Sequence, residues 1–478
     1  MENGTRRKGE RRTEHGTRRT ERMLSLLLGL FLHCIITTAH SEKPERMLIV
    51  SPSIFMNTLQ PLIEWRIQHG IEIDILNMDS VGQTPAELKA AITGHYAQLP
   101  FTYLLLVGDD MHIPAYIVRK SDKYYIMDNW YAELSGNEGY PDVAMGRFSA
   151  ETAEQVALQV EKTIAYETYP PETEYFSIFA GIASENGPGD QNEYDFEHIR
   201  NIGKRLLGYT YTSGYEFFEG THGELDLPGN PHAGMISSAI NDGVGILFYC
   251  GHGESNRFVT GNFQSSHINS LTNYNKLPVV ISTACFNGNY AERTCMAEHW
   301  LRASHEGKAT GAVAALMCSG NVEWNEPMAG QDEITDILTN PSINPQEKTL
   351  GKMVLQSLHK ITDTYDNPET SQSWLLFGDP ALTVRTAKPN DINIIQPVIK
   401  EIQCYPNPTN GQLYIHFSEL PNEQTEVVLC SISGNCVATF SLSGMENSID
   451  LAHLPQGVYI VQIIHQNSII STKKIIKR

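Results

Sequence analysis

Two residues that can perform nucleophilic chemistry follow predicted buried strands in this sequence. Residues 245–250 read as a strand that runs into Gly251-His252-Gly253, and residues 279–283 read as a strand that ends at Ala284-Cys285. A thiol with a nearby imidazole is the minimum for a nucleophile with an acid/base partner, and glycines on both sides of His252 permit a sharp turn. The pair therefore predicts thiol catalysis. Taken singly, Cys285 also fits a buried core thiol and His252 an ordinary loop residue.

Alternating strands and helices must position these residues. Apolar runs that read as strands cover residues 47–50, 71–76, 103–108, 176–182 and 312–317, and helices are expected at 54–69, 86–99, 154–166, 196–208, 233–242 and 350–363. This alternation implies a parallel sheet with helices on both faces. Functional groups in such sheets gather beyond the carboxyl ends of the strands. We expect an α/β fold, an αβα sandwich in two subdomains, residues 41–165 and 166–386.

The pattern of the sequence changes from alternating strands and helices to short β runs near residue 387. After a linker at 387–400, residues 401–478 contain short alternating β runs at 412–417, 426–429, 436–442, 457–465 and 468–476, separated by turn residues. No helical pattern of useful length is visible there. The pattern predicts a small C-terminal β-sandwich.

Charge and cysteine content exclude some classes of protein. The 478 residues hold 55 acidic and 35 basic residues, a formal net charge of −20, and residues 41–391 carry 45 acids against 22 bases. Nucleic acid is therefore excluded as the main partner, because phosphate binding needs a basic surface. Eight cysteines are too few for a disulfide scaffold.

The first forty residues are expected to lie outside the fold. A basic lead, an apolar run at 24–32 and small residues near Ala39 are typical of a secretory signal peptide. The run is shorter than the roughly 20 residues that span a membrane, although a retained signal anchor is the alternative. No later segment has the length and apolarity of a membrane helix. The predicted signal peptide leads us to expect an exported chain.

The sequence resembles the gingipain-type cysteine peptidases, members of the caspase-like clan. The resemblance begins with Gly-His252-Gly and Ala-Cys285 and extends in the family's order over residues 47–386. It includes Tyr103-Leu-Leu-Leu-Val-Gly-Asp109, Asp142-Val-Ala-Met-Gly-Arg147, Gly187-Pro188, Pro327-Met-Ala-Gly-Gln331 and Trp374-Leu-Leu-Phe-Gly378-Asp379-Pro380. The resemblance implies a caspase-like fold and a cysteine endopeptidase.

The resemblance also implies roles for individual residues. Cys285 would be the nucleophile and His252 the imidazole that protonates the leaving amine, with the backbone N–H groups of Gly253 and Cys285 lining the oxyanion hole. Glu185 matches the acidic residue that supports the histidine. The alternative for Glu185 is a solvated loop carboxylate.

A substrate pocket for a basic side chain follows from the same resemblance. Asp195 matches the aspartate that holds the guanidinium, Trp324 the aromatic wall and Met328 the floor. A planar cation against an indole and paired with a carboxylate is physically favourable. Asp195 could instead cap the helix that follows it. Val322-Glu323 departs from the small polar pair of the family, which points to a different subsite preference.

The tail resembles the C-terminal sorting domain of type IX secretion cargo, on Tyr405-Pro-Asn-Pro-Thr-Asn-Gly411, Gly457-Val-Tyr-Ile-Val461 and Lys473-Lys-Ile-Ile-Lys-Arg478. A generic β-module is the alternative. The resemblance implies the type IX secretion machinery as a partner and a secreted or cell-surface location. It implies no organic cofactor. Gingipains carry structural calcium, and acid-rich loops here could hold it, although none has a diagnostic ligand spacing.

We therefore expect an exported cysteine endopeptidase that cleaves protein or peptide substrates after basic residues, arginine before lysine. One alternative is a catalytically silent binding protein on the same fold, which the presence of both His252 and Cys285 disfavours. Another is a caspase-like peptidase of different specificity, which would not need Asp195.

Overall fold

The computed structural model describes residues 45–386 apart from 121–122, 137–138, 169–173, 292 and 344, and residues 402–478 apart from 418–424, 432–435, 443 and 466–467. The predicted signal peptide at 1–40 and the linker at 387–400 lie outside these residues. The chain divides into two compact units, Met1–Lys388 and Pro389–Arg478. The subdomain boundaries within the first unit stay predictions.

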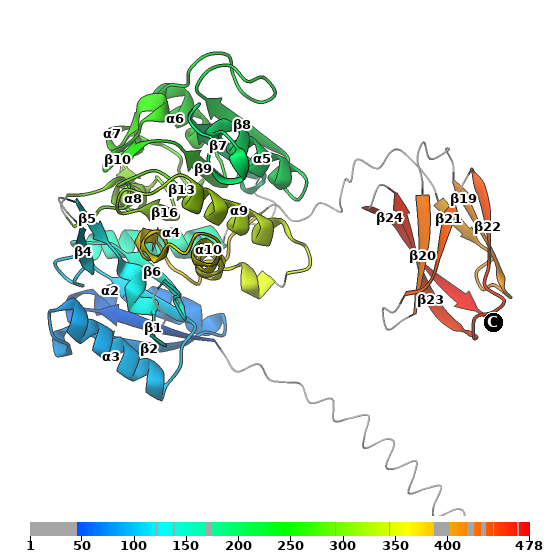
Figure 1. Ribbon diagram of the computed structural model, residues 1–478. Helices are drawn as coiled ribbons and strands as arrows, with labels where there is room; N and C mark the ends of the chain where they lie inside the picture. The colour runs from blue at the N-terminus through cyan, green and yellow to red at the C-terminus, as the bar shows by residue number, and fades with distance from the viewer. Residues whose placement is uncertain are drawn as a thin grey trace, which may run out of the picture. The chain divides into compact units, whose positions relative to one another are not determined.

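One ten-stranded sheet forms the centre of the first unit (Figure 1), in the order β2-β1-β3-β6-β17-β16-β13-β9-β7-β8. All neighbouring strands are parallel except β16 and β17. The sheet therefore consists of two parallel halves that run in opposite directions. Its strands are β1 (Arg46–Ser51), β2 (Glu72–Asn77), β3 (Tyr103–Val107), β6 (Ala144–Phe148), β7 (Ile178–Ala183), β8 (Ser213–Phe218), β9 (Ile246–Cys250), β13 (Val279–Ser282), β16 (Ala314–Cys318) and β17 (Trp374–Phe377).

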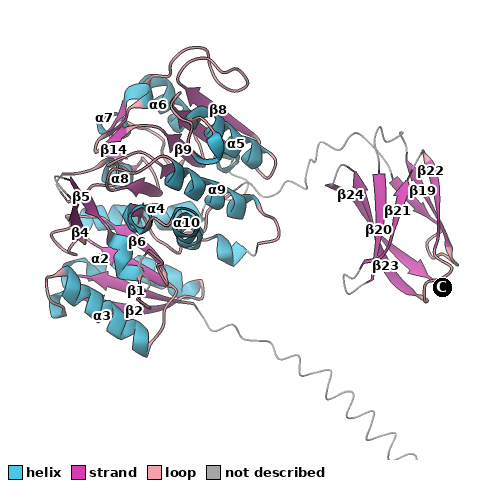
Figure 2. Ribbon diagram, in the orientation of Figure 1, coloured by secondary structure: helices cyan, strands magenta, loops and turns pink. Residues whose placement is uncertain are grey.

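Helices cover both faces of this sheet (Figure 2), because the central strands are apolar on both sides. In β9, Ile246 and Phe248 join one core, while Leu247 and Tyr249 join the other. The first core is closed by α5 (Asp195–Leu207), α9 (Asn325–Thr339) and α10 (Leu350–Tyr365), the second by α6 (Ala233–Asp242) and α8 (Met296–Arg302). Around β1 and β3, α2 (Ser53–Gln68) and α4 (Ala153–Thr168) cover one face and α3 (Pro85–Gln98) the other.

Short strands and helices complete this unit. They are β4 (Ile117–Lys120), β5 (Lys123–Ile126), β10 (Gly253–Glu254), β11 (Arg257–Phe258), β12 (Phe263–Gln264), β14 (Ser304–His305), β15 (Lys308–Ala309), α7 (Ser265–Ile268) and α11 (Pro368–Ser373). No helix among the residues that the structure describes is long and apolar enough to cross a membrane.

The expected α/β fold is confirmed, and every strand and helix predicted for this unit exists within about two residues of its expected ends. The strands β6, β8 and β17, the helix α9 and the short elements given above were not predicted from the sequence. Nor was it predicted that β17 pairs antiparallel with β16 while lying parallel to β6. The two expected subdomains share one continuous sheet.

The second unit is the expected β-sandwich. A sheet of β18 (Ile402–Tyr405), β19 (Gln412–Phe417) and β22 (Glu446–Asp450) and a sheet of β20 (Thr425–Ser431), β21 (Cys436–Leu442), β23 (Gly457–His465) and β24 (Ser468–Lys477) contribute to one apolar core. Leu413 and Ile415 of β19 alternate with exposed residues and join Val461 and Ile463 of β23 in that core. The strands β18 and β22 were not predicted.

Candidate active site

Cys285 and His252 lie at the same edge of the sheet. They follow the parallel neighbours β13 and β9, in which Ser282 is paired with Tyr249. Each candidate residue stands three positions beyond this registered pair. Because parallel strands end at a common edge, the fold brings the predicted nucleophile and imidazole to one place.

Gly253 connects the two strand ends directly. A Cβ atom built at this position would lie 2.6 Å from Ala284 Cβ and 2.7 Å from the carbonyl oxygen of Cys285. Such contacts are too short for any side chain, so glycine allows the backbone after His252 to pack against the nucleophile segment.

The nucleophile sits in a tight, well-anchored turn. Phe286 has a φ of 62°, an uncommon left-handed conformation for an aromatic residue, and its N–H donates to the carbonyl of Gly320 at 3.0 Å. Asn287 Nδ2 donates to the carbonyls of the neighbouring loop at Glu254 and Arg257. The turn leaves Cys285 half-buried.

Cys285 is also in contact with the segment that follows β16. Its Sγ lies 3.7 Å from Asn321 Oδ1 and 3.9 Å from the carbonyl oxygen of Val322. Sequence reasoning missed Asn321. Asn321 could have been singled out, because it is a polar residue shortly after the predicted buried strand at 312–317.

Burial distinguishes Cys285 from the other cysteines that the structure describes in this unit. Cys250, Cys295 and Cys318 are fully buried, and burial raises the pKa of each thiol well above its ordinary value. A buried thiol with a raised pKa is a poor nucleophile. Cys250 lies inside β9 and Cys295 immediately before α8, as expected from the sequence.

The imidazole of His252 is exposed and packs edge-on against Trp324. The two ring centroids lie 4.9 Å apart with an interplanar angle of 90°. The main chain of His252 is fixed, since its carbonyl accepts hydrogen bonds from Tyr249 Oη at 2.6 Å and from the N–H of Val259 at 3.0 Å. The indole thus limits the position of the imidazole, and His252 stays exposed.

Glu185 lies just after β7 at the same edge, but its contacts are elsewhere. Its side chain is 56% exposed, and Oε1 lies 3.3 Å from Nε2 of His222. Among the described residues, no hydrogen bond or ion pair joins Glu185 to His252. Support of His252 by Glu185 stays a prediction, and it would require the carboxylate to turn away from His222.

Asp195 is fully buried beneath Trp324. Its carboxylate accepts hydrogen bonds from the Ser184 hydroxyl, from Trp324 Nε1 at 2.5 Å and from Cys250 Sγ at 3.3 Å. Burial raises the pKa of Asp195, an effect that these hydrogen bonds oppose. Asp195 is the first residue of α5, with Tyr194 in the capping position, so the alternative of a helix cap is wrong.

Trp324 and Met328 form one wall with Gly189. A Cβ atom built at Gly189 would lie 2.4 Å from Met328 Sδ and 3.0 Å from Trp324 Cδ1. The structure therefore brings Asp195, Trp324 and Met328 together, with Trp324 also touching His252. Their roles in binding substrate stay predictions.

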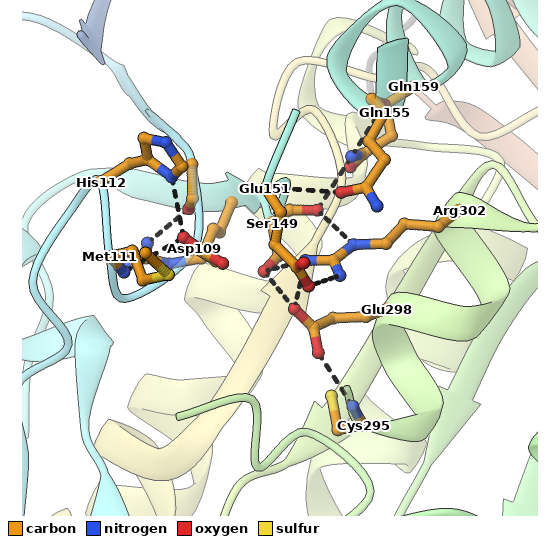
Figure 3. Close-up of polar contacts among 12 residues, drawn as sticks. Asp109, Met111, His112, Ser149, Glu151, Gln155, Gln159, Cys295, Glu298 and Arg302 are labelled. Carbon is orange, nitrogen blue, oxygen red and sulfur yellow. Dashed lines mark hydrogen bonds and ion pairs between the residues drawn. The ribbon is translucent and has the colours of Figure 1, made fainter. Parts of the chain in front are cut away.

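A buried polar cluster anchors α8, the helix that follows the nucleophile loop (Figure 3). The Glu298 carboxylate accepts hydrogen bonds from the Ser149 hydroxyl at 2.7 Å, from Arg302 at 2.5 Å and from the N–H of Cys295 at 2.8 Å. Ser149 follows β6, so this cluster ties α8 to the other half of the sheet. Burial raises the pKa of Glu298.

The described residues contain no clear set of ligands for the expected calcium ion. Among the residues that the structure describes, no three or more His, Cys, Asp or Glu side chains are grouped as a metal ion would need. The calcium expectation therefore stays without named ligands.

Comparisons with known proteins agree with this geometry. Residues 40–385 match the profile of "Peptidase family C25", and residues 403–478 that of "Secretion system C-terminal sorting domain". Gingipain R2 of Porphyromonas gingivalis is 31% identical over 373 residues, which are 76% of this chain and 49% of that protein. Lys-gingipain HG66 of the same organism is 28% identical over 306 residues, 61% of this chain and 17% of that protein.

Solved structures of gingipains are similar to this chain. The crystal structure of the Arg-specific cysteine proteinase gingipain R is similar with a TM-score of 0.67 and 25% identity, covering 92% of this chain and 100% of that one. The complex of the pro- and mature domains of Porphyromonas gingivalis RgpB gives a TM-score of 0.67 and 26% identity, with 91% and 100% covered.

The chain spans about half the length of the curated gingipain R2 it matches. Its sorting domain marks it for export, as a secreted or surface-attached protein. The resemblance seen in the sequence is confirmed: the chain belongs to peptidase family C25, the family of the gingipains, and ends in a secretion-system sorting domain.

Proposed function

We propose that this protein is a cysteine endopeptidase that cleaves after basic residues, arginine before lysine. The observation that carries the proposal is the meeting of Cys285 and His252 at the ends of the parallel neighbours β13 and β9. Retention of both residues disfavours a silent binding protein on the same fold.

The chemistry follows from these groups. The Cys285 thiolate attacks the scissile carbonyl carbon, and the N–H groups of Gly253 and Cys285 stabilise the oxyanion that forms. His252 then protonates the departing amine, which leaves a thioester on Cys285. Water, activated by the same imidazole, cleaves the thioester to release the acid and restore the thiol. Each oxyanion-hole donor would contribute about 10²–10³ in rate.

Specificity for a basic side chain would depend on Asp195. Its buried carboxylate can bind a guanidinium bidentately, whereas lysine offers only a point charge. In the structure, Trp324 Nε1 donates a hydrogen bond to one oxygen of this carboxylate. An incoming guanidinium would therefore displace that indole N–H and stack on the indole face. The names Arg-specific gingipain R and Lys-gingipain of the relatives support a basic substrate.

Export would use the type IX secretion machinery, which the sorting domain at residues 403–478 supports. The substrates would then be proteins or peptides met outside the cell.

Hydrolysis of peptidyl-arginine, peptidyl-lysine and neutral peptide amides by the purified chain tests the proposal. We expect Arg to be cleaved faster than Lys, and Cys285→Ala to lower kcat/KM by roughly 10⁴-fold or more with unchanged circular dichroism. Cys404→Ala, a partly buried thiol of the C-terminal unit, should behave as the wild type. Unchanged turnover in Cys285→Ala would refute the mechanism, and faster cleavage of neutral peptides would refute the specificity.

A further inference from the structure

A buried glutamine of α9 is hydrogen-bonded to both strands that carry the candidate catalytic pair. Gln331 is fully buried, and its Nε2 donates to the carbonyl of Tyr249 at 3.1 Å and to that of Ile281 at 3.0 Å. Tyr249 lies in β9, three residues before His252. Ile281 lies in β13, four residues before Cys285. The side chain therefore connects α9 to the strand ends at which the nucleophile and the imidazole meet.

The other end of this amide is fixed as well. The Oε1 atom of Gln331 lies 3.0 Å from Nε2 of His198, a fully buried residue of α5. Because an amide oxygen only accepts hydrogen bonds, Nε2 of His198 carries the proton and donates. The two N–H groups and the oxygen of Gln331 thus all have partners, which holds the amide in one orientation.

The two strands are also paired without this amide. Tyr249 and Ser282 are registered neighbours, and the N–H of Thr283 donates to the carbonyl of Tyr249 at 3.1 Å. A carbonyl oxygen has two lone pairs, so Gln331 adds a hydrogen bond to this ladder without replacing one. What Gln331 fixes in addition is the position of α9 relative to β9 and β13.

The same helix carries part of the candidate substrate pocket. Trp324 caps the N-terminus of α9, and Met328 lies in its second turn. Trp324, Met328 and Gln331 are spaced by four and three residues, which places them along one face of the helix. A displacement of α9 would therefore move the pocket wall relative to the Cys285 thiol.

We propose that Gln331 is a positioning residue that sets the substrate pocket on α9 at the correct distance from Cys285 and His252. The inference rests on the proposed function, since it takes Trp324 and Met328 as pocket residues. Gln331 would act through α9, β9 and β13 and not on the reacting atoms. Correct placement matters because an error of about 1 Å between the scissile bond and the nucleophile can cost roughly 100-fold in rate.

Gln331→Met tests the inference, because methionine has a similar volume and no hydrogen-bond donor. Two reactions are compared in the folded variant. Hydrolysis of a peptidyl-arginine amide uses the pocket, whereas alkylation of Cys285 by iodoacetamide, followed by mass spectrometry, does not. We expect kcat for the amide to fall about 10- to 100-fold, with a smaller change in KM, and the alkylation rate to change less than about 2-fold. A role in stability alone would leave both rates of the folded protein unchanged.

Gln159→Met is the matched control. Gln159 is a buried glutamine of α4 whose Nε2 also donates to two carbonyls, those of Ser149 at 3.0 Å and Gln155 at 3.2 Å. Its replacement should leave kcat and the alkylation rate as in the wild type. Gln331→Asn keeps the amide on a side chain one methylene shorter, and it gives the same test if circular dichroism shows that Gln331→Met does not fold.

Several results would overturn the inference while the proposed function stands. They are wild-type kcat in the folded Gln331 variants, an equal fall of kcat in Gln159→Met, an equal fall of hydrolysis and alkylation, and failure of both Gln331 variants to fold, which would assign this residue to stability. If the wild type cleaves no arginine peptide, the proposed function fails and the inference fails with it.

Discussion

The surroundings of Asp195 act on the ionisation of its carboxyl group in two opposite directions. It is fully buried and held by Ser184, Trp324 and Cys250. Desolvation favours its neutral form, whereas these donors favour the carboxylate. Only the ionised form can pair with a guanidinium, so the proposed recognition of arginine would be coupled to this ionisation.

The proposed arginine selectivity should therefore depend on pH. The pKa of Asp195 is raised above its ordinary value of 3.8, so the carboxylate becomes protonated as the pH falls through this raised value. The ratio of kcat/KM for an arginine peptide to that for its neutral citrulline analogue should fall at a pH above 3.8. The ratio cancels the ionisations of Cys285 and His252, which both substrates share.

Asp195→Asn provides the control for this prediction. It should lower the arginine-to-citrulline ratio about 100-fold, the effect of removing one partner of a buried charge pair, and make the ratio independent of pH. An equal loss on both substrates would instead assign Asp195 a structural role.

The candidate nucleophile and imidazole were predictable, because each follows a buried apolar run and strand ends share an edge. The hydrogen bond from Trp324 to the buried Asp195 carboxylate was not predictable. These residues are 129 positions apart, and a hydrogen bond between them depends on how α5 and α9 pack.

At the scale of elements, the turn after Cys285 is held by close backbone contact. The N–H of Gly288 donates to the carbonyl of Cys318 at 2.8 Å, and a Cβ atom built at Gly288 would lie 2.7 Å from the carbonyl oxygen of Met317. This contact fixes the nucleophile loop against β16. Any side chain at position 288 must push the loop away from the strand.

Gly288→Ala should therefore lower both stability and turnover. We expect a loss of about 1–3 kcal/mol in the free energy of unfolding, measured by denaturant titration, and a lower kcat. Gly94→Ala is the matched control. It lies in α3 with nothing within 4 Å of its built Cβ, and should gain roughly 0.5–1 kcal/mol. Wild-type stability and kcat in Gly288→Ala would contradict this account of the loop.

Some elements could not be predicted from sequence pattern. The apolar run of β17 was not recognised as a strand, because it is only four residues long, and its direction depends on its pairing with β16. Helix α9 buries polar side chains, among them Gln331, whose amide donates to the carbonyls of Tyr249 and Ile281. Such a helix lacks the apolar stripe that reveals helices in a sequence.

At the scale of the whole molecule, the alternation of strands and helices predicted the α/β unit and the alternation of short β runs predicted the sandwich. Each unit has apolar cores of its own. The excess of acidic residues in 41–391 belongs to the unit that carries the candidate site. The proposed role of the buried Asp195 carboxylate does not depend on this overall charge, because charges on the surface are screened.

The central claim is that one of the eight cysteines is the nucleophile of a peptidase. Reaction of the full chain with a peptidyl-arginine acyloxymethyl ketone, followed by mass spectrometry of its digest, tests this claim most directly. We predict one adduct, on Cys285, formed in step with the loss of activity and prevented by an arginine peptide. An adduct on any other cysteine that tracks the loss of activity, or full loss of activity with Cys285 unmodified, would contradict the account.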